Sequence, residues 1–594
     1  MRTIALKSAL VLSAVALAAP SGRAQQAQEP RAATPMTAPN WDVLLRPRVR
    51  ASAPTTAAIT SADLQTRVYL FADDSLNGRQ LASEENFRAT EYLAREARRI
   101  GLVPMGENGT YFQAINMVER TLDPSARLAI GSTALTPWTD YVVRDQGPGA
   151  RSLDGVQVVY GGNIGDSASL IDPAAVAGKL VVLTVPSTGE RAGLASVNRG
   201  VLTRAFINAA GIAVVVLDYA TPAILDSWKE AGQMLKRDNP VFRPVPTLLY
   251  LNRRSAAALL NGNVDSVRTG ATGATVTVTP RFVESPIKFP ARNVVAALPG
   301  SDPKLRSEYV ALGSHNDHVD HNSRPVAHDS IYIVHHLFRT GGAEDPAPRL
   351  TPEQQAQVNA LIADIRRKTN GSSARLDSIY NGADDDASGS MAMLEIAEYY
   401  AAQRVKPKRS LLFVWHVGEE AGLFGSEWYT DHPTVPRESI VAQLNMDMIG
   451  RGGASDISRV TKDGVRYIGN PDHVQLIGGR RLSTQLGDLA EAASKSQPRP
   501  LQVDYSMDAN GHPLNIYCRS DHYEYARYGI PIVFVTTGGH ADYHMVTDEP
   551  QYIDYDKLTR VTQYVSDLAG RLAEMPNRPV VDKPKPDPKG QCIQ

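Results

Sequence analysis

Five short motifs rich in His, Asp and Glu lie in the second half of the chain, and each follows an apolar run. In order they are Gly313-Ser-His315-Asn-Asp317, Gly382-Ala-Asp384-Asp385-Asp386-Ala-Ser-Gly389, Gly418-Glu419-Glu420, Asn445-Met-Asp447-Met448 and Asp542-Tyr-His544. Imidazole and carboxylate groups are ligands of zinc and similar cations, and a two-metal site joins its ions through a shared carboxylate. The motifs therefore predict a site for two metal ions.

The elements that must position these motifs alternate between apolar strands and helices. The predicted strands are Asn293–Leu298, Tyr309–Gly313, Leu411–Val417, Val441–Met446 and Pro531–Thr536. A helix starting near Ser388 is expected between two of them. Continuous apolar strands separated by helices predict an α/β fold with a mostly parallel central sheet flanked by helices. Ligands of such folds gather at the carboxyl ends of strands, which is where the motifs fall.

The chemistry of the residues assigns some roles and leaves others open. Adjacent side chains in extended backbone point in opposite directions, so one of Glu419 and Glu420 can bind metal while the other faces the substrate as a general base. Both His540 and His544 follow the last strand, and spacing does not decide which one is a ligand. His318 is assigned to a position behind the ligands or at the surface.

The five motifs resemble, in the same order, those of the co-catalytic di-zinc exopeptidases. This family contains secreted bacterial aminopeptidases and glutamate carboxypeptidase-like enzymes. The resemblance implies two zinc ions per chain, with His315 and Asp447 on one ion and Glu420 and His544 on the other. Asp385 would bridge the two ions.

The same resemblance implies further roles. Glu419 would be the general base, and Asp317 would orient His315. The segment that would line the substrate pocket is Arg519, Ser520, Asp521 and His522. Two departures stand out, because Asp384 replaces an Asn of many relatives and residues 320–377 form a long insertion, for which a lid or a narrowed channel is expected.

The domain organisation follows from composition and resemblance. Residues 1–24 have the basic, apolar and small-residue order of a signal peptide, and residues 25–56 have the composition of a linker. Residues 57–140 and 286–575 would form the peptidase domain. Residues 141–285 would form an inserted β-rich domain, because Val156–Leu251 resembles the protease-associated insert of such enzymes. Residues 576–594 would form an irregular tail.

Composition restricts the partners and the location. The formal net charge of −1 is unlike the basic character of nucleic-acid-binding proteins, and no stretch after the signal peptide is apolar for long enough to span a membrane. Peptides are the expected partners, in the periplasm or outside the cell. The only two cysteines, Cys518 and Cys592, could form a disulfide between the tail and the catalytic half, or stay unpaired.

The sequence therefore predicts a secreted or periplasmic zinc exopeptidase, and an aminopeptidase is favoured. A carboxypeptidase is the first alternative, since Arg519 and Arg451 lie near the motifs and could bind a terminal carboxylate. A glutaminyl-cyclase-like acyltransferase or an inactive binding module on the same scaffold would lack some of the metal ligands. A serine hydrolase is disfavoured, because no Gly-x-Ser-x-Gly motif lies between an apolar strand and a helix.

Overall fold

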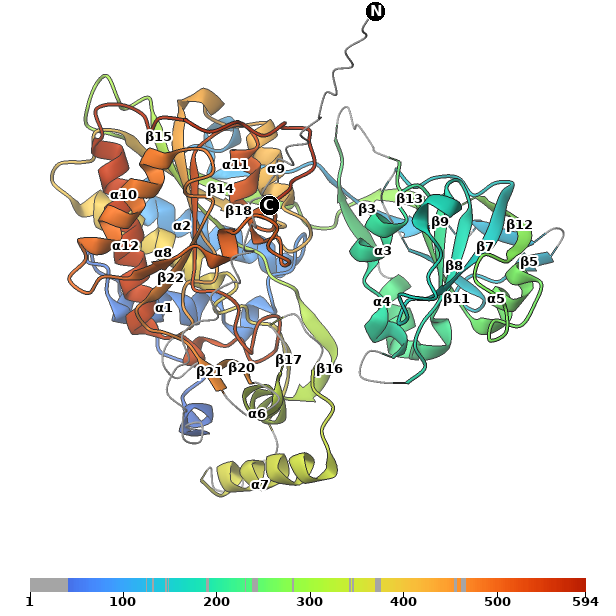
Figure 1. The fold of residues 1–594 in the computed structure, drawn as a ribbon. Coiled ribbons are helices and arrows are strands. Elements are labelled where there is room, and N and C mark those ends of the chain that lie inside the picture. The colour runs from blue at the N-terminus through green and yellow to red at the C-terminus, as the bar shows by residue number, and fades with distance from the viewer. Residues whose placement is uncertain are drawn as a thin grey trace, which may run out of the picture.

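The computed structural model describes residues 41–594, apart from positions 124, 131–132, 145–146, 148, 189–191, 230, 238–243, 280–281, 341–342, 344–346, 369–374, 453–456 and 461–465. The expected signal peptide and residues 25–40 of the expected linker lie outside this part of the chain. Figure 1 shows a large body that contains the metal-site motifs and a smaller β-rich body beside it.

The large body is built on a mixed sheet. Its main path of strands has the order β1 (Val103–Pro104), β14 (Arg292–Leu298), β18 (Ser410–His416), β15 (Tyr309–His315), β19 (Ile440–Met446), β24 (Ile532–Thr536), β22 (His473–Ile477) and β23 (Gln502–Asp504), and β2 (Phe112–Ala114) also pairs with β14. The four middle strands, from β18 to β24, are mutually parallel, whereas β14 and β22 run antiparallel to them. The predicted α/β fold with a parallel centre is confirmed, and the antiparallel strands at the two sides make the whole sheet mixed.

Helices cover both faces of this sheet, because successive strand residues point to opposite sides and both sides are apolar. Phe413 and Trp415 pack under one group of helices, and Leu412 and Val414 pack under another. The first group is α1 (Ser61–Phe71), α2 (Glu84–Ile100), α8 (Ala387–Ala402), α10 (Thr484–Lys495) and α12 (Tyr555–Glu574). The second group contains α9 (Phe424–Asp431) and α11 (His522–Ala526).

The insertion at 320–377 has secondary structure of its own. Its elements are β16 (His321–Ala327), α6 (His328–Phe338), α7 (Pro352–Lys368) and β17, which ends just beyond it (Leu376–Ile379). They form the lower part of the large body in Figure 1, beside the short hairpin of β20 (Ile457–Val460) and β21 (Arg466–Ile468). Residues 41–45, in the expected linker, form a short 3-10 helix whose Leu44 is buried against Ile333 of α6.

The β-rich body contains two sheets. Its strands are β3 (Met117–Leu122), β4 (Arg127–Ile130), β5 (Thr133–Leu135), β6 (Tyr141–Arg144), β7 (Val156–Asn163), β8 (Leu180–Thr184), β9 (Gly211–Val215), β10 (Gly232–Leu235), β11 (Thr247–Leu251), β12 (Thr272–Thr279) and β13 (Phe282–Pro286). Its helices are α3 (Arg199–Ala205), α4 (Pro222–Lys229) and α5 (Arg253–Leu260). This body begins about twenty residues before the expected boundary at 141, because β3 and β4 pair with later strands of the same body and β5 pairs with β4.

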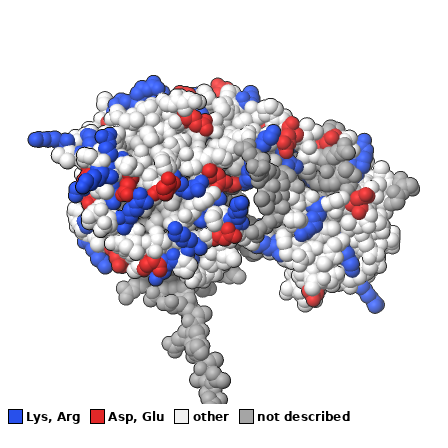
Figure 2. Space-filling model, turned by 90° about the horizontal axis from the view of Figure 1, so that it is seen from above, with Lys and Arg blue, Asp and Glu red and all other residues white. Residues whose placement is uncertain are grey.

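The C-terminal tail is fixed to the large body by a disulfide between Cys518 and Cys592. The tail has no helix or strand after α12 among its described residues. In that part of the chain, none of the helices combines the length and apolar character needed to cross a membrane. On the face shown in Figure 2, acidic and basic side chains are interspersed over both bodies.

Candidate metal centre

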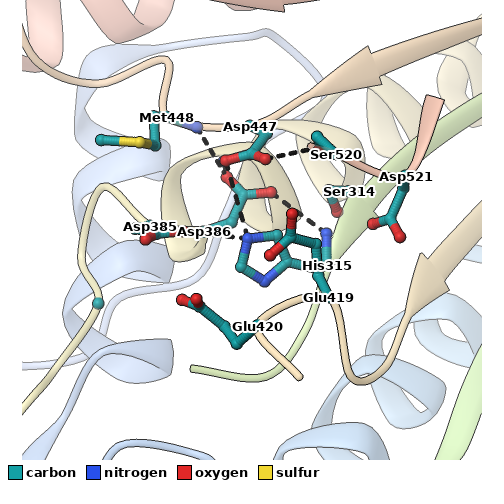
Figure 3. Close-up of polar contacts among 12 residues, drawn as sticks. Ser314, His315, Asp385, Asp386, Glu419, Glu420, Asp447, Met448, Ser520 and Asp521 are labelled. Carbon is teal, nitrogen blue, oxygen red and sulfur yellow. Dashed lines mark hydrogen bonds and ion pairs between the residues drawn. The ribbon is translucent and has the colours of Figure 1, made fainter. Parts of the chain in front are cut away.

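The motifs converge at one edge of the sheet because the strands that precede them are parallel. His315 is the last residue of β15, Glu419 and Glu420 follow β18 closely, and Asp447 directly follows β19. Parallel strands carry their carboxyl ends to the same edge. Figure 3 shows these side chains gathered around the imidazole of His315.

Asp385 lies between two imidazoles. Its Oδ1 is 3.0 Å from Nε2 of His315, and its Oδ2 is 3.1 Å from Nε2 of His544. The next residue, Asp386, caps the N-terminus of α8 by accepting a hydrogen bond from the backbone N–H of Gly389 at 2.9 Å. The helix start therefore fixes a carboxylate whose two oxygens face two separate groups of ligands.

The first group contains His315 and Asp447. Asp447 Oδ1 lies 3.7 Å from His315 Nε2, and its Oδ2 accepts a hydrogen bond from the hydroxyl of Ser520 at 2.7 Å. Asp386 also lies close to this group, but its oxygens accept backbone N–H groups of His315, Gly389 and Met448. Asp386 thus ties the second and fourth motifs together.

The second group contains an imidazole, that of His318, which was not expected among the ligands. Glu420 Oε2 is 3.0 Å from His544 Nε2, and Glu420 Oε1 is 2.7 Å from Nδ1 of His318. His318, Asp385, Glu420 and His544 each bring one ligand atom to within 4.8 Å of the others. His318 is buried and lies among the ligand atoms, rather than behind them or at the surface. Its position three residues after His315 was the one signal in the sequence that pointed to it.

Asp317 differs from the expectation that its carboxylate orients His315. Nδ1 of His315 donates to the backbone carbonyl of Asp317 at 3.0 Å, which leaves Nε2 free to face the carboxylates. The carboxylate oxygen Oδ1 instead accepts the backbone N–H groups of Gly418 at 2.7 Å and Glu419 at 3.3 Å. The side chain of Asp317 therefore holds the loop that carries Glu419.

The structure separates His540 from His544. His544 lies in the second ligand group, whereas Nε2 of His540 is 3.3 Å from Oδ2 of Asp384. Asp384 Oδ1 accepts the backbone N–H of Gly450 at 2.6 Å. The additional carboxylate at position 384 is thus directed at His540 and the Gly450 backbone, and it leaves the ligand set unchanged.

A cavity of about 470 Å³ opens beside the ligands. Asp385, Glu419 and Asp447 form its polar part, together with Arg519, Ser520 and Tyr543. Its apolar wall consists of Met448, Met507, Leu514, Ile516 and Phe534. Asn198 of the β-rich body and Ala343, just beyond the insertion's α6, also reach it.

Only half of the expected pocket segment lines this cavity. Arg519 and Ser520 do, but Asp521 and His522 are fully buried beneath it. Asp521 Oδ2 lies 3.4 Å from Nδ1 of His416, and the ring of His522 stacks on Phe534 with 4.6 Å between centroids. Helix α11 begins at His522, so these side chains turn into the core and help support the strand ends.

Burial and mutual charge perturb the site's acids and bases. Burial raises the pKa of Glu419 well above its ordinary value, and the charges of Asp447 and Glu420 add to this effect while His315 opposes it. Burial lowers the pKa of His544, but hydrogen bonds to Asp385 and Glu420 outweigh it and bring the pKa to about 10. The imidazoles of His315 and His544 both lie against buried carboxylates. Imidazole and carboxylate groups arranged in this way are suitable ligands for zinc.

A separate buried cluster has the composition of a metal site, but arginine side chains balance the charge of its carboxylates. His328, Asp377 and Glu549 lie within 4.8 Å of one another. Arg48 forms ion pairs with Asp377 and Glu549, and Arg375 contacts His328. Guanidinium groups therefore neutralise these carboxylates, and the cluster joins the insertion to residue 549 beyond the His544 motif.

Comparison with known proteins agrees with the motifs. Residues 361–569 match Peptidase family M28. The chain is 40% identical over 80 residues to leupeptin-inactivating enzyme 1 of Streptomyces exfoliatus, which covers 13% of this chain and 18% of that protein. It is 33% identical over 111 residues to a probable leucine aminopeptidase of Arthroderma otae, covering 17% and 31%. The chain thus spans less than a third of the length of these relatives.

Solved structures give more extended matches at lower identity. An aminopeptidase from Aneurinibacillus sp. strain AM-1 matches with 16% identity and a TM-score of 0.46, over 89% of this chain and 97% of that one. BSAP, a zinc aminopeptidase from Bacillus subtilis, matches with 13% identity and a TM-score of 0.42, over 86% and 95%.

Proposed function

We propose that this chain is a secreted or periplasmic zinc-dependent aminopeptidase, because residues 361–569 match Peptidase family M28. The observation that carries the proposal is the position of Asp385 between His315 and His544, at the edge of a cavity large enough for a peptide end. His315, Asp447 and Asp385 would hold one zinc ion. Glu420, His544 and Asp385 would hold the other.

Glu419 would act as the general base. When bound, the two zinc ions would acidify a water molecule and polarise the scissile carbonyl. Glu419 lines the cavity beside Asp385 and Asp447, so its carboxylate could take the water's proton and return it to the leaving amine. Asp317 would keep Glu419 in place through the backbone of the Gly418–Glu419 loop.

The relatives that the chain matches favour an aminopeptidase, since they include a probable leucine aminopeptidase of Arthroderma otae. Asp385 and Asp447 would be bound to zinc, so Glu419 is the lining carboxylate left to attract the ammonium group of a peptide N-terminus. The apolar wall around Ile516 and Phe534 would accept an apolar side chain of the first residue.

A carboxypeptidase is the second candidate, because Arg519 also lines the cavity and could bind a terminal carboxylate. It is the weaker proposal, because the relatives' names point to aminopeptidases. The inactive-module and cyclase-like alternatives are disfavoured by the convergence of the whole predicted ligand set beside a cavity.

Export is proposed from two features. Residues 1–24 have the residue order of a signal peptide, and the Cys518–Cys592 disulfide suits an oxidising compartment. The β-rich body would be a protease-associated domain, on the resemblance of Val156–Leu251.

The proposed roles are tested by Glu419→Gln. The variant should bind as much zinc as the wild type, because this substitution alters none of the five proposed ligands. Its turnover of an unblocked peptide should fall by roughly 10²- to 10⁴-fold, the usual contribution of a general acid–base residue. Full activity at unchanged zinc content would remove Glu419 from this role.

A further inference from the structure

We propose that His318 is a fourth protein ligand of the second zinc position, an inference that rests on the proposed two-zinc function. The second position would then be filled by side chains from His318, Asp385, Glu420 and His544. The first position, with three side-chain ligands, would then be the one that binds the water molecule of the proposed reaction, and the second ion would contribute its charge.

The distances between ligand atoms of the four side chains carry this proposal. Nδ1 of His318 is 2.7 Å from Glu420 Oε1 and 3.8 Å from Asp385 Oδ2. Nε2 of His544 is 3.0 Å from Glu420 Oε2 and 3.1 Å from Asp385 Oδ2. Ligand atoms about 2.0–2.1 Å from a tetrahedral zinc lie about 3.3 Å from one another, and the observed separations lie on both sides of that value.

The backbone around His318 holds its ring in this position. Gly382 has a φ of +55°, and a Cβ added there would lie 2.6 Å from Cγ and Cδ2 of His318, so a side chain at position 382 would displace the ring. The backbone N–H of His318 donates to the carbonyl of Arg79 at 3.3 Å. The buried guanidinium of Arg79 in turn donates to the carbonyls of Asn381 at 2.7 Å and Gly382 at 3.0 Å. The segment before the bridging Asp385 and the ring of His318 are therefore fixed together.

The two positions would consequently differ in kind. Structural zinc sites have four protein ligands, whereas catalytic sites keep one position open. His315, Asp385 and Asp447 supply three ligand atoms to the first position, and Ser520 occupies the other oxygen of Asp447. The second position should bind zinc more tightly and should be the first to fill when metal is added to metal-free protein.

The alternative role for His318 is to donate a hydrogen bond to Glu420 without binding metal, and two substitutions separate the roles. Asparagine places an amide where Nδ1 of His318 lies and can keep that hydrogen bond, but an amide is a poor zinc ligand. Aspartate places a carboxylate there, which can bind zinc but repels Glu420 when no metal is bound. A ligand role predicts that His318→Asp retains the second zinc and that His318→Asn loses it. A hydrogen-bonding role predicts the reverse order.

The experiment is a titration of the metal-free full chain with Zn²⁺ and Co²⁺, with bound metal and the visible absorption of Co²⁺ as readouts. His540→Asn serves as the matched control, since His540 is buried nearby but contacts Asp384 instead of the ligand groups. We expect His318→Asn to lower the metal affinity of the tighter site by more than about 100-fold, which exceeds the usual cost of losing a residue that only supports a ligand. The substitution should also change the absorption spectrum of the first equivalent of bound Co²⁺.

Other results of the titration would contradict the proposal. Two tight sites and an unchanged Co²⁺ spectrum in His318→Asn would overturn the proposal, as would loss of zinc in His318→Asp alone. If circular dichroism shows that both variants fail to fold, the Co²⁺ spectrum of the wild type is the remaining test. A spectrum in which the first equivalent of bound Co²⁺ is not four-coordinate would contradict the proposal. A wild-type protein that binds no zinc would instead refute the proposed function itself.

Discussion

The side-chain carboxylate of Asp317 accepts the backbone N–H of Gly418 at 2.7 Å, and it does not form the hydrogen bond that orients His315. The backbone carbonyl of Asp317 makes that bond, so substitution of the side chain leaves it in place. This relationship separates metal binding from the placement of Glu419.

Asp317→Ala should therefore lower kcat while leaving the zinc content near that of the wild type. Loss of a residue that supports a catalytic group typically costs about 10- to 100-fold, and we expect a decrease of this size. Asp317→Asn retains the acceptor oxygen and should lose less. Elemental analysis and steady-state kinetics on the same samples measure both quantities; a loss of zinc parallel to the loss of kcat would contradict this assignment.

The insertion should support the metal loop as well as reach the cavity. Nη1 of Arg339, just after α6, donates to the carbonyl of Ala541 at 3.2 Å, three residues before His544. Arg339→Met should weaken zinc binding at the second position by about 10- to 100-fold, as expected for loss of a supporting contact. Arg367→Met, on the exposed side of α7, is the matched control and should bind zinc like the wild type. Equal affinities in the two variants would show that the insertion does not hold this loop.

Stability should fall in acid because of His522. Burial lowers the pKa of His522 to about 3, against an ordinary value of 6.5. Between these values the unfolded chain binds a proton that the folded chain excludes, so the free energy of unfolding decreases as pH falls from 6.5 toward 3, by at most about 1.4 kcal/mol per pH unit for one group.

His522→Phe keeps an aromatic ring on Phe534 and should flatten this dependence in urea titrations between pH 4 and 6.5. His321→Asn, which changes a partly exposed histidine, is the control and should behave as the wild type. An unchanged slope in His522→Phe would mean that His522 is not the group responsible.

The disulfide should affect substrate binding more than metal binding. Cys518 ends the segment that supplies Met507, Leu514 and Ile516 to the cavity, and Gln594 accepts the backbone N–H groups of Gly511 and Tyr517. The bridge joins residues 74 positions apart, which corresponds to about 4 kcal/mol in the chain-entropy description.

The double variant Cys518→Ser/Cys592→Ser should have a lower Tm and a higher KM for peptides with a bulky apolar first residue. Its zinc content should stay unchanged. A reductant should produce the same changes in the wild type and none in the double variant. Unchanged KM in the double variant would show that the tail does not support the cavity wall.

The sequence predicted the positions of site residues best where a residue lies at the end of a buried strand. Continuous apolar runs locate β15, β18, β19 and β24 to within two residues, because a buried strand must be apolar on both faces. Parallel pairing then brings His315, Glu420 and Asp447 to one edge. The contacts made by loop residues could not be predicted from the apolar runs, because these contacts depend on the backbone turns between the strands.

His318 and Asp317 illustrate that limit. Two or three residues after a strand end, the direction of a side chain depends on loop backbone geometry that periodicity does not describe. The pairing of Asp384 with His540 joins residues 156 positions apart, and the apolar wall of the cavity comes from the irregular segment before Cys518. The early start of the β-rich body was not predicted, because β3 and β4 join it through pairing with β10, β12 and β13, more than a hundred residues along the chain.

The central claim, that the chain removes residues from the N-terminus of peptides, is tested most directly by hydrolysis of one short peptide in free, N-acetylated and C-amidated forms with zinc present. Because an aminopeptidase requires a free N-terminal amine on its substrate, we expect cleavage of the free and amidated forms and none of the acetylated form. Cleavage of the free and acetylated forms with loss on amidation would contradict the account and identify a carboxypeptidase; no cleavage of any form would contradict a peptidase function.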